Sequence, residues 1–303
     1  MNCVLVHETR IGARKSNQDR LGFWRTGQSL LMVVADGLGG HLHGEIAAQV
    51  AVQYFAAAFQ REARPLLAAP EVFLAKSMNG AHAAILREAQ RLQLADTPRT
   101  VIVACVVQEG HAYWTHVGDC RLYVVRRGSI LQRTRDHTVV QQLLDAGRIR
   151  EEAVTTHPDR NRLLQCLGSL QAPKPDMVER LRLKRDDLIL LCSDGLWGPL
   201  TQRQLLHALV TRALEQAVPE LADLAEVRAG PQCDNVTVLA MAWGEDEMLP
   251  ADEPPTIPAQ ELPTDVQDFT ATDPDFLRMS DEDIEKAIAE LKAALRKTPP
   301  QQR

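Results

Sequence analysis

Short apolar runs rich in β-branched residues recur along this chain, and several follow one another directly in the sequence. The runs at 101–107 and 112–117 are separated by only four residues, an interval typical of a β-hairpin. The strands that we expect lie at residues 4–8, 30–35, 101–107, 112–117, 121–126, 188–192 and 236–242.

Four longer segments carry apolar residues at intervals of three and four, which predicts amphipathic helices. They occur in two pairs, at 45–60 with 71–92 and at 202–214 with 215–227. Runs of strands accompanied by paired helices, rather than a strict alternation of strand and helix, predict an α+β fold and not a doubly wound parallel sheet. Hydrophobic residues make up 45% of the chain, which is enough to build the core of such a domain.

The C-terminal segment differs in composition from the rest of the chain. Residues 245–303 contain 15 acidic and 6 basic side chains and 8 of the 17 prolines, but no glycine. We therefore predict a domain over residues 1–244, an acidic proline-containing linker over 245–275 and an amphipathic helix over 276–297. A capping signature beginning at Ser280 supports this helix, which could dock on its own domain or recruit a partner.

Charge and hydropathy exclude several classes of protein. The formal net charge is −6 and there is no long basic run, which argues against nucleic-acid binding. The longest apolar run, Val101–Val107, is too short to span a membrane, and the N-terminus lacks the features of a secretory signal. Six cysteines form no CxxC pair and lie mostly in strand-like runs, as reduced core cysteines do. We expect a cytoplasmic protein that binds neither membranes nor nucleic acid.

Five aspartates stand at the ends of expected strands or in the loops beside them. They are Asp19, Asp36, Asp119, Asp194 and Asp234. One aspartate after a strand is most often part of a turn, but five that converge would form a negative cluster that needs cations to stay ionised. Oxygen ligands select Mg²⁺ or Mn²⁺, to which the backbone carbonyl of Gly37 could contribute. A zinc site at His41 and His43 is the weaker alternative, because no His/Cys set has zinc spacing.

Five segments, in this order and spacing, resemble the metal-dependent serine/threonine protein phosphatases of the PP2C type (PPM family), in particular the bacterial subgroup. They are R-K-S-N-Q-D at 14–19, V-A-D-G-L-G-G-H at 34–41, H-V-G-D-C-R-L-Y at 116–123, S-D-G-L-W at 193–197 and D-N-V-T at 234–237. The resemblance covers residues 5–243. It implies a four-layer α/β/β/α sandwich of two antiparallel sheets flanked by helices, with metals at one end and a flap at about 136–170.

The resemblance also implies a set of metal ligands. Asp36 would bridge two ions, the Gly37 carbonyl would bind one of them, and Asp194 with Asp234 would bind the other. Asp119 resembles the position that, together with Asp194, supports a weaker third ion in bacterial members. The implied cofactor is therefore two Mn²⁺ or Mg²⁺ ions, with a weaker third.

Arg14 and Asp19 are the catalytic residues that the resemblance implies. Arg14 falls where the family places its phosphate-binding arginine, whose planar fork binds phosphate oxygens in a bidentate way. Asp19 looks like the acidic neighbour that holds metal-bound water. The implied mechanism is attack on phosphorus by a water that two metal ions activate, without a covalent phosphoenzyme.

Some positions depart from the family pattern or have a structural interpretation. Leu38 replaces a histidine that eukaryotic members carry as a proposed general acid, which leaves that role unassigned, with metal-bound water or His41 as candidates. Gln18 stands where many members have glutamate. We interpret Thr100 as structural, and we expect His116 to be a hydrogen-bonded core residue. We expect Trp197 to serve in packing.

The predicted function is hydrolysis of phosphoserine and phosphothreonine in proteins, opposing a bacterial serine/threonine kinase. A pseudophosphatase that binds phosphoproteins or a partner through the tail is one alternative, although the complete metal set argues against it. A hydrolase of small phosphoesters is another, because the same centre could perform that reaction.

Overall fold

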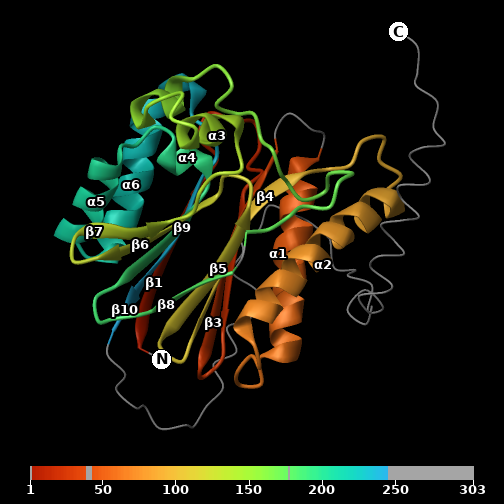
Figure 1. Ribbon diagram of the computed structural model, residues 1–303, viewed down its shortest axis with the longest axis horizontal. Helices are drawn as coiled ribbons and strands as arrows, with labels where there is room; N and C mark the ends of the chain where they lie inside the picture. The colour runs from red at the N-terminus through yellow and green to blue at the C-terminus, as the bar shows by residue number, and fades with distance from the viewer. Residues whose placement is uncertain (1, 39–42, 177, 245–303) are drawn as a thin grey trace.

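The computed structural model describes residues 2–38, 43–176 and 178–244, which form two five-stranded sheets packed face to face (Figure 1). All neighbouring strands in both sheets are antiparallel. The first sheet has the order β1 (Cys3–Arg10), β10 (Val236–Trp243), β9 (Leu188–Cys192), β6 (Arg121–Arg126) and β7 (Ser129–Arg133). The second has the order β2 (Arg20–Arg25), β3 (Ser29–Gly37), β4 (Thr100–Gln108), β5 (His111–Val117) and β8 (Glu179–Arg182).

Two pairs of helices cover the outer faces of the sandwich. Helices α1 (Gly44–Glu62) and α2 (Pro70–Arg91) pack on the second sheet. Helices α5 (Gln202–Thr211) and α6 (Leu214–Ala229) pack on the first. The predicted α+β fold, a four-layer sandwich of two antiparallel sheets flanked by helices, is confirmed.

The central strands are apolar on both faces because both faces are buried. In β3, Leu31 and Val33 contact the α1–α2 layer, whereas Leu30 and Met32 face the other sheet. Successive side chains of a strand point to opposite faces, so a strand between two layers needs an almost continuous apolar run. This is why the runs at 30–35 and 101–107 could be recognised in the sequence.

Three strands were not predicted: β2, β7 and β8. All three lie at the edge of a sheet and their short sequences include charged residues, as in RLGFWR of β2 and ERLR of β8. An edge strand exposes one side to solvent, so its sequence carries a weak apolar signal and its position is decided by pairing. The hairpin between β4 and β5 is present, and its turn residues Glu109 and Gly110 both have positive φ, as a type I′ turn requires.

Residues 136–170 lie beside one end of the sandwich, where the flap was expected. They contain α3 (Val139–Asp145) and a 3₁₀ segment, η1 (Glu151–Thr156). Thr138 caps α3 by accepting a hydrogen bond from the amide of Gln141 (3.1 Å). Single bridges from Thr138 to Leu163 and from Thr100 to Leu167 fasten the segment.

The structure bears on membrane-spanning helices and on the cysteines, but not on the C-terminal tail. Within the described ranges, no helix is both long and apolar enough to cross a membrane. All six cysteines are free. The predicted linker at 245–275 and helix at 276–297 lie outside the described residues, as does His41, so these predictions stay untested.

Candidate metal centre

The five aspartates converge at one end of the sandwich. Asp36 is the second-last residue of β3, and Asp194 begins α4 (Asp194–Trp197), which follows β9 after one residue. Burial raises the pKa of Asp36 well above its usual value, and the charges of the other four aspartates raise it further. The structure therefore brings together residues that are up to 215 positions apart in the sequence, as the strand-end pattern predicted.

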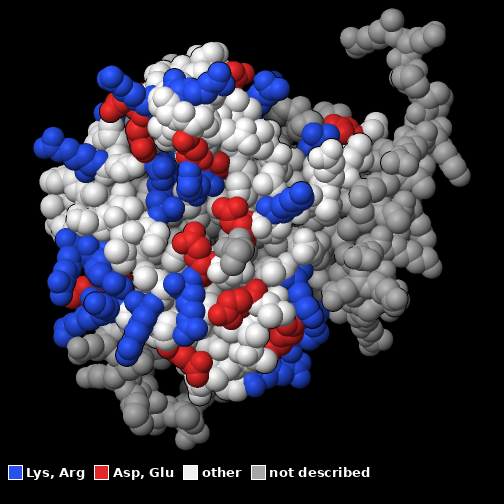
Figure 2. Space-filling view, viewed as in Figure 1, with Lys and Arg blue, Asp and Glu red and all other residues white. Residues whose placement is uncertain are grey.

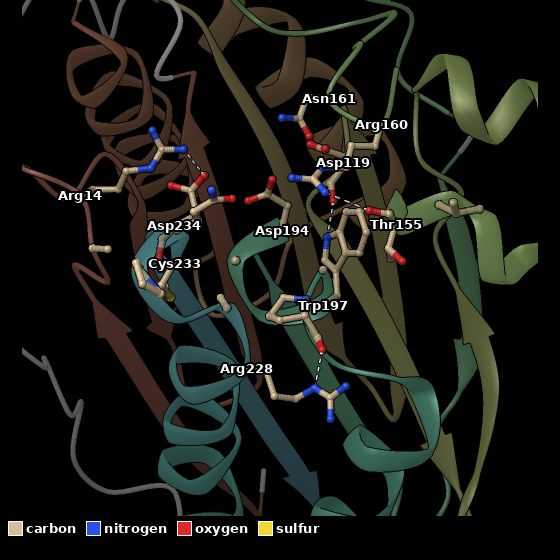
Figure 3. Close-up of a pocket in the computed structure, with 18 of the residues that line it drawn as sticks. Arg14, Asp119, Thr155, Arg160, Asn161, Asp194, Trp197, Arg228, Cys233 and Asp234 are labelled. Atoms are coloured by element: carbon tan, nitrogen blue, oxygen red, sulfur yellow. Dashed lines mark hydrogen bonds and ion pairs between the residues drawn. The ribbon is translucent and has the colours of Figure 1, made fainter. Parts of the chain in front are cut away.

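A pocket of about 600 Å³ opens at this cluster (Figure 3). In Figure 3, Asp119, Asp194 and Asp234 point into a common space, with Arg14 at its edge. The pocket is closed on other sides by the flap, the start of α4 and the C-terminal end of α6. Residues from these segments include Thr155, Arg160, Asn161, Trp197, Pro199, Arg228 and Gln232. On the face shown in Figure 2, acidic side chains gather near the middle and basic side chains surround them.

The electrostatics of the cluster favour a cation. Burial raises the pKa of Asp19 to about 7, with contributions from the charges of Asp194 and Asp234. Burial and the charge of Asp234 raise the pKa of Asp194 to about 6. One oxygen of Asp19, Oδ1, is buried without a hydrogen-bond partner among the described residues. Crowded carboxylates with an unpartnered buried oxygen fit hard divalent cations, which would offset the charge repulsion.

Asp19 is held in place by Ser193, the residue that precedes Asp194. The Ser193 hydroxyl donates to Asp19 Oδ2 (2.7 Å) and accepts from the amide of Thr237 (3.0 Å). This serine was not predicted as a site residue. Its only signal in the sequence is its position in the S-D-G-L-W segment, since its partner is 174 positions away.

Arg14 lies in a loop that Asn235 fastens to the site. The Asn235 side chain donates to the carbonyls of Ile11 (2.9 Å) and Ser16 (3.0 Å) and accepts from the amide of Gln18 (2.8 Å). Arg14 Nη2 binds Asp234 Oδ2 at 2.5 Å, and half of its side chain remains exposed. Sequence reasoning missed Asn235, whose position beside Asp234 was the available signal.

The backbone around Asp36 is fixed from two sides. Thr100 Oγ1 donates to the carbonyl of Asp36 (2.6 Å), so the interpretation of Thr100 as structural is confirmed. A Cβ at Gly37 would collide with the backbone of Gly44, so this position requires glycine because α1 begins against it. Leu38 packs against the core between the sheets and offers no proton donor.

Asp119 lies in the turn between β5 and β6, in contact with α4. The indole nitrogen of Trp197 donates to the Asp119 carbonyl (2.9 Å), a bond that Figure 3 shows as a dashed line. The Arg121 guanidinium stacks 3.5 Å from the centre of the Trp197 ring and forms a buried bidentate pair with Asp136 (2.8 and 2.7 Å). Trp197 thus packs as expected, and it also bonds to the turn that carries Asp119.

A separate group of potential ligands lies at His116, His137 and Asp176, whose ligand atoms are within 4.8 Å of one another. His116 is buried and its Nε2 bonds to the carbonyl of Arg135 (2.8 Å). The two imidazole rings are stacked at 4.5 Å and tilted by only 19°. Because imidazole binds metals in the plane of its ring, near-parallel rings do not aim at one ion. His116 is the hydrogen-bonded core residue that we expected.

Comparison with known proteins gives consistent matches. The family described as Protein phosphatase 2C matches residues 8–227. A "Putative protein phosphatase 2C-type" of Streptococcus pyogenes is 30% identical over 243 residues, which are 79% of this chain and 97% of that protein. The "Serine/threonine protein phosphatase PstP" of Mycobacterium tuberculosis is 34% identical over 209 residues, which are 69% of this chain. This chain spans only 39% of the length of that mycobacterial relative.

The fold is similar to solved structures as well. The catalytic domain of PstP in complex with two manganese ions matches with a TM-score of 0.68 and 27% identity. That match covers 80% of this chain and 99% of the solved one.

Proposed function

We propose that this chain, which belongs to the protein phosphatase 2C family, removes phosphate from phosphoserine and phosphothreonine in proteins by means of a divalent-metal centre. The observation that carries the proposal is the convergence of five aspartates at one end of the sandwich, where three of them, Asp119, Asp194 and Asp234, line a pocket together with Arg14. Similarity to relatives named as serine/threonine phosphatases supports protein dephosphorylation, and their names supply the substrate class. The physiological counterpart would be a serine/threonine kinase of the same cell.

Asp36 would bridge two ions, with the Gly37 carbonyl on one of them and Asp194 and Asp234 on the other. Asp119 would join Asp194 in holding a weaker third ion. The all-oxygen donor set suits Mn²⁺ or Mg²⁺, and a related phosphatase domain has been solved with two manganese ions. When bound, such ions lower the pKa of a coordinated water, so that a hydroxide nucleophile is available near neutral pH.

Arg14 would bind the phosphate of the substrate. Among the described residues, the Arg14 guanidinium binds Asp234 through Nη2, and its other N–H groups are available to donate to phosphate oxygens. Its half-exposed side chain at the edge of the pocket can reach an incoming phosphoserine or phosphothreonine without rearrangement of the loop that Asn235 holds. A bidentate contact would orient the phosphoryl group for in-line attack.

Asp19 would orient the attacking water and accept its proton at Oδ1, the oxygen without a partner. Its Oδ2 is held by the Ser193 hydroxyl, so Oδ1 is the oxygen available to the water. No histidine lines the described part of the pocket. Protonation of the leaving alkoxide therefore falls to water or to His41, which lies outside the described residues.

The test is phosphate release from a phosphothreonine peptide with Mn²⁺, with EDTA, and for the variant Asp194→Asn. Asp223→Asn is the matched control, because Asp223 is an exposed carboxylate on α6 that pairs with Arg10. We expect EDTA and Asp194→Asn to abolish activity while Asp223→Asn keeps it. Activity that survives either EDTA or Asp194→Asn would overturn the metal-centre proposal.

Two further comparisons separate the alternatives. An inactive wild-type protein that still binds the phosphopeptide would indicate a pseudophosphatase. Turnover of an aryl phosphate without turnover of the peptide would indicate a hydrolase of small phosphoesters. Truncation after residue 244 tests the tail, and a loss on a native phosphoprotein but not on the peptide would support recruitment.

A further inference from the structure

The turn that carries Asp119 has a constrained backbone. Gly118 adopts φ +99°, a conformation that favours glycine, and a Cβ at this position would collide with the side chain of Val101. Asp119 itself is buried and follows Gly118 directly in this turn. The direction of its carboxylate therefore depends on how the Gly118 peptide is held.

His137 bonds to Gly118 through both its backbone and its ring. The Gly118 amide donates to Nδ1 of His137 (3.1 Å), and the His137 amide donates to the Gly118 carbonyl (2.9 Å). Nδ1 must be unprotonated to accept this bond, so the ring proton lies on Nε2, which donates to Asp176 Oδ1 (3.2 Å). Stacking on His116 fixes the plane of the ring.

The neighbours of His137 hold the same turn. The backbone carbonyl of Arg135 accepts a hydrogen bond from Nε2 of His116, and both carboxylate oxygens of Asp136 bind the Arg121 guanidinium. Trp197 holds the carbonyl of Asp119 from the opposite side. Among these contacts, the ring of His137 is the one that fixes the amide preceding Asp119.

We propose that His137 is a positioning residue for Asp119, and that its unprotonated Nδ1 holds the Gly118–Asp119 turn so that the Asp119 carboxylate lies beside Asp194. The inference rests on the proposed function, in which Asp119 and Asp194 hold the weaker third ion. His137 touches neither substrate nor ion. Loss of its acceptor atom frees the Gly118 amide, so that the turn is held less firmly, by the remaining bonds to the carbonyls of Gly118 and Asp119. Partners that orient metal ligands typically contribute about 10- to 100-fold to metal affinity.

The variants His137→Asn and His137→Leu separate the acceptor atom from the bulk of the ring. The Oδ1 of asparagine occupies nearly the same place as Nδ1 and can accept the Gly118 bond, whereas leucine fills space but accepts nothing. His111, a half-buried histidine at the start of β5, provides the control variants His111→Asn and His111→Leu. Mn²⁺ alone is the probe, titrated by calorimetry into the full-length metal-free protein.

We expect the wild type, His137→Asn and both His111 variants to bind two tighter ions and a weaker third. His137→Leu keeps the two tighter ions but loses about 10- to 100-fold in affinity for the third. A His137→Leu variant that binds the third ion like the wild type would overturn the inference. Equal loss in His137→Asn and His137→Leu would also overturn it, because the acceptor atom would then not be the cause.

The ring tautomer supplies a second readout that needs no variant to fold. Nitrogen-15 NMR of the metal-free wild type is expected to show His137 with a proton on Nε2 and none on Nδ1. A proton on Nδ1 would overturn the inference. A wild type that binds only two ions would also overturn it while leaving the phosphatase proposal intact, whereas a wild type that binds no ion would overturn both.

Discussion

Replacement of Asp19 by asparagine should change how the stability of the metal-free protein depends on pH. Asp19 is 3% exposed, and burial raises its pKa from 3.8 to about 7. A carboxyl group whose pKa is higher in the folded state favours folding when it is protonated. Its stabilising contribution is therefore complete below about pH 4 and is lost as the pH rises to about 7. Asparagine cannot ionise, so the variant lacks this loss.

The size of the effect follows from the displacement of the pKa. A shift of about three units corresponds to roughly 4 kcal/mol in total, of which about 2 to 3 kcal/mol is lost between pH 5 and pH 8. Asparagine also lowers the free energy of unfolding in its own right, because its amide group would occupy the place of Oδ1 of Asp19, a buried atom without a hydrogen-bond partner among the described residues. That cost is the same at both pH values and cancels in the comparison.

The assay is urea unfolding of the wild type and Asp19→Asn in EDTA at pH 5 and pH 8. Relative to the wild type, the variant should gain about 2 to 3 kcal/mol in free energy of unfolding on going from pH 5 to pH 8. The exposed control Asp223→Asn should show no such gain. Mn²⁺ at pH 8 should stabilise the wild type more than the variant. A free-energy difference between variant and wild type that is equal at both pH values would refute the reasoning.

Three further substitutions test the parts of the site separately. Arg14→Lys keeps the positive charge but loses the planar guanidinium. The value of kcat/KM on a phosphothreonine peptide should therefore fall by roughly 10- to 100-fold, while Mn²⁺ binding stays unchanged. Unchanged kinetics would contradict the role of Arg14. Asn235→Ala frees the loop that carries Arg14. It should raise KM and lower the free energy of unfolding in urea by about 1 to 3 kcal/mol. An unaltered KM would show that other contacts hold the loop. Trp197→Phe removes the hydrogen bond to the Asp119 carbonyl but keeps an aromatic ring. Calorimetry should show weaker binding of the third Mn²⁺ ion. An isotherm like that of the wild type would contradict a role of this hydrogen bond in ion binding.

The parts of the fold that could be predicted are those whose signal is local. Strands β3 and β4 are buried on both faces and therefore carry long apolar runs. Edge strands such as β8 carry charged residues, and only their pairing partners decide that they are strands. Helix ends are similar. The sequence predicted that one helix ends at 214 and the next begins at 215, whereas in the structure the two helices are separated by Arg212 and Ala213, between α5 and α6.

The site shows a similar division. The aspartates could be predicted because each stands next to a recognisable strand, and because the segments around them resemble a known family. The residues that hold them could not, because their contacts join distant segments. Ser193 binds Asp19 across 174 positions and Asn235 binds Gln18 across 217, so neither contact leaves a spacing that a single sequence can reveal. His137 likewise looked like part of a polar flap until its ring was placed against Gly118.

We propose that the converging aspartates form a metal centre bridged by Asp36. The most direct test is a crystal structure of the protein grown with Mn²⁺, with anomalous diffraction recorded on both sides of the manganese absorption edge. We expect two strong manganese peaks that share Asp36 as a ligand, one of them also bound by Asp194 and Asp234. Peaks that do not share Asp36, or manganese bound only elsewhere on the protein, would contradict it.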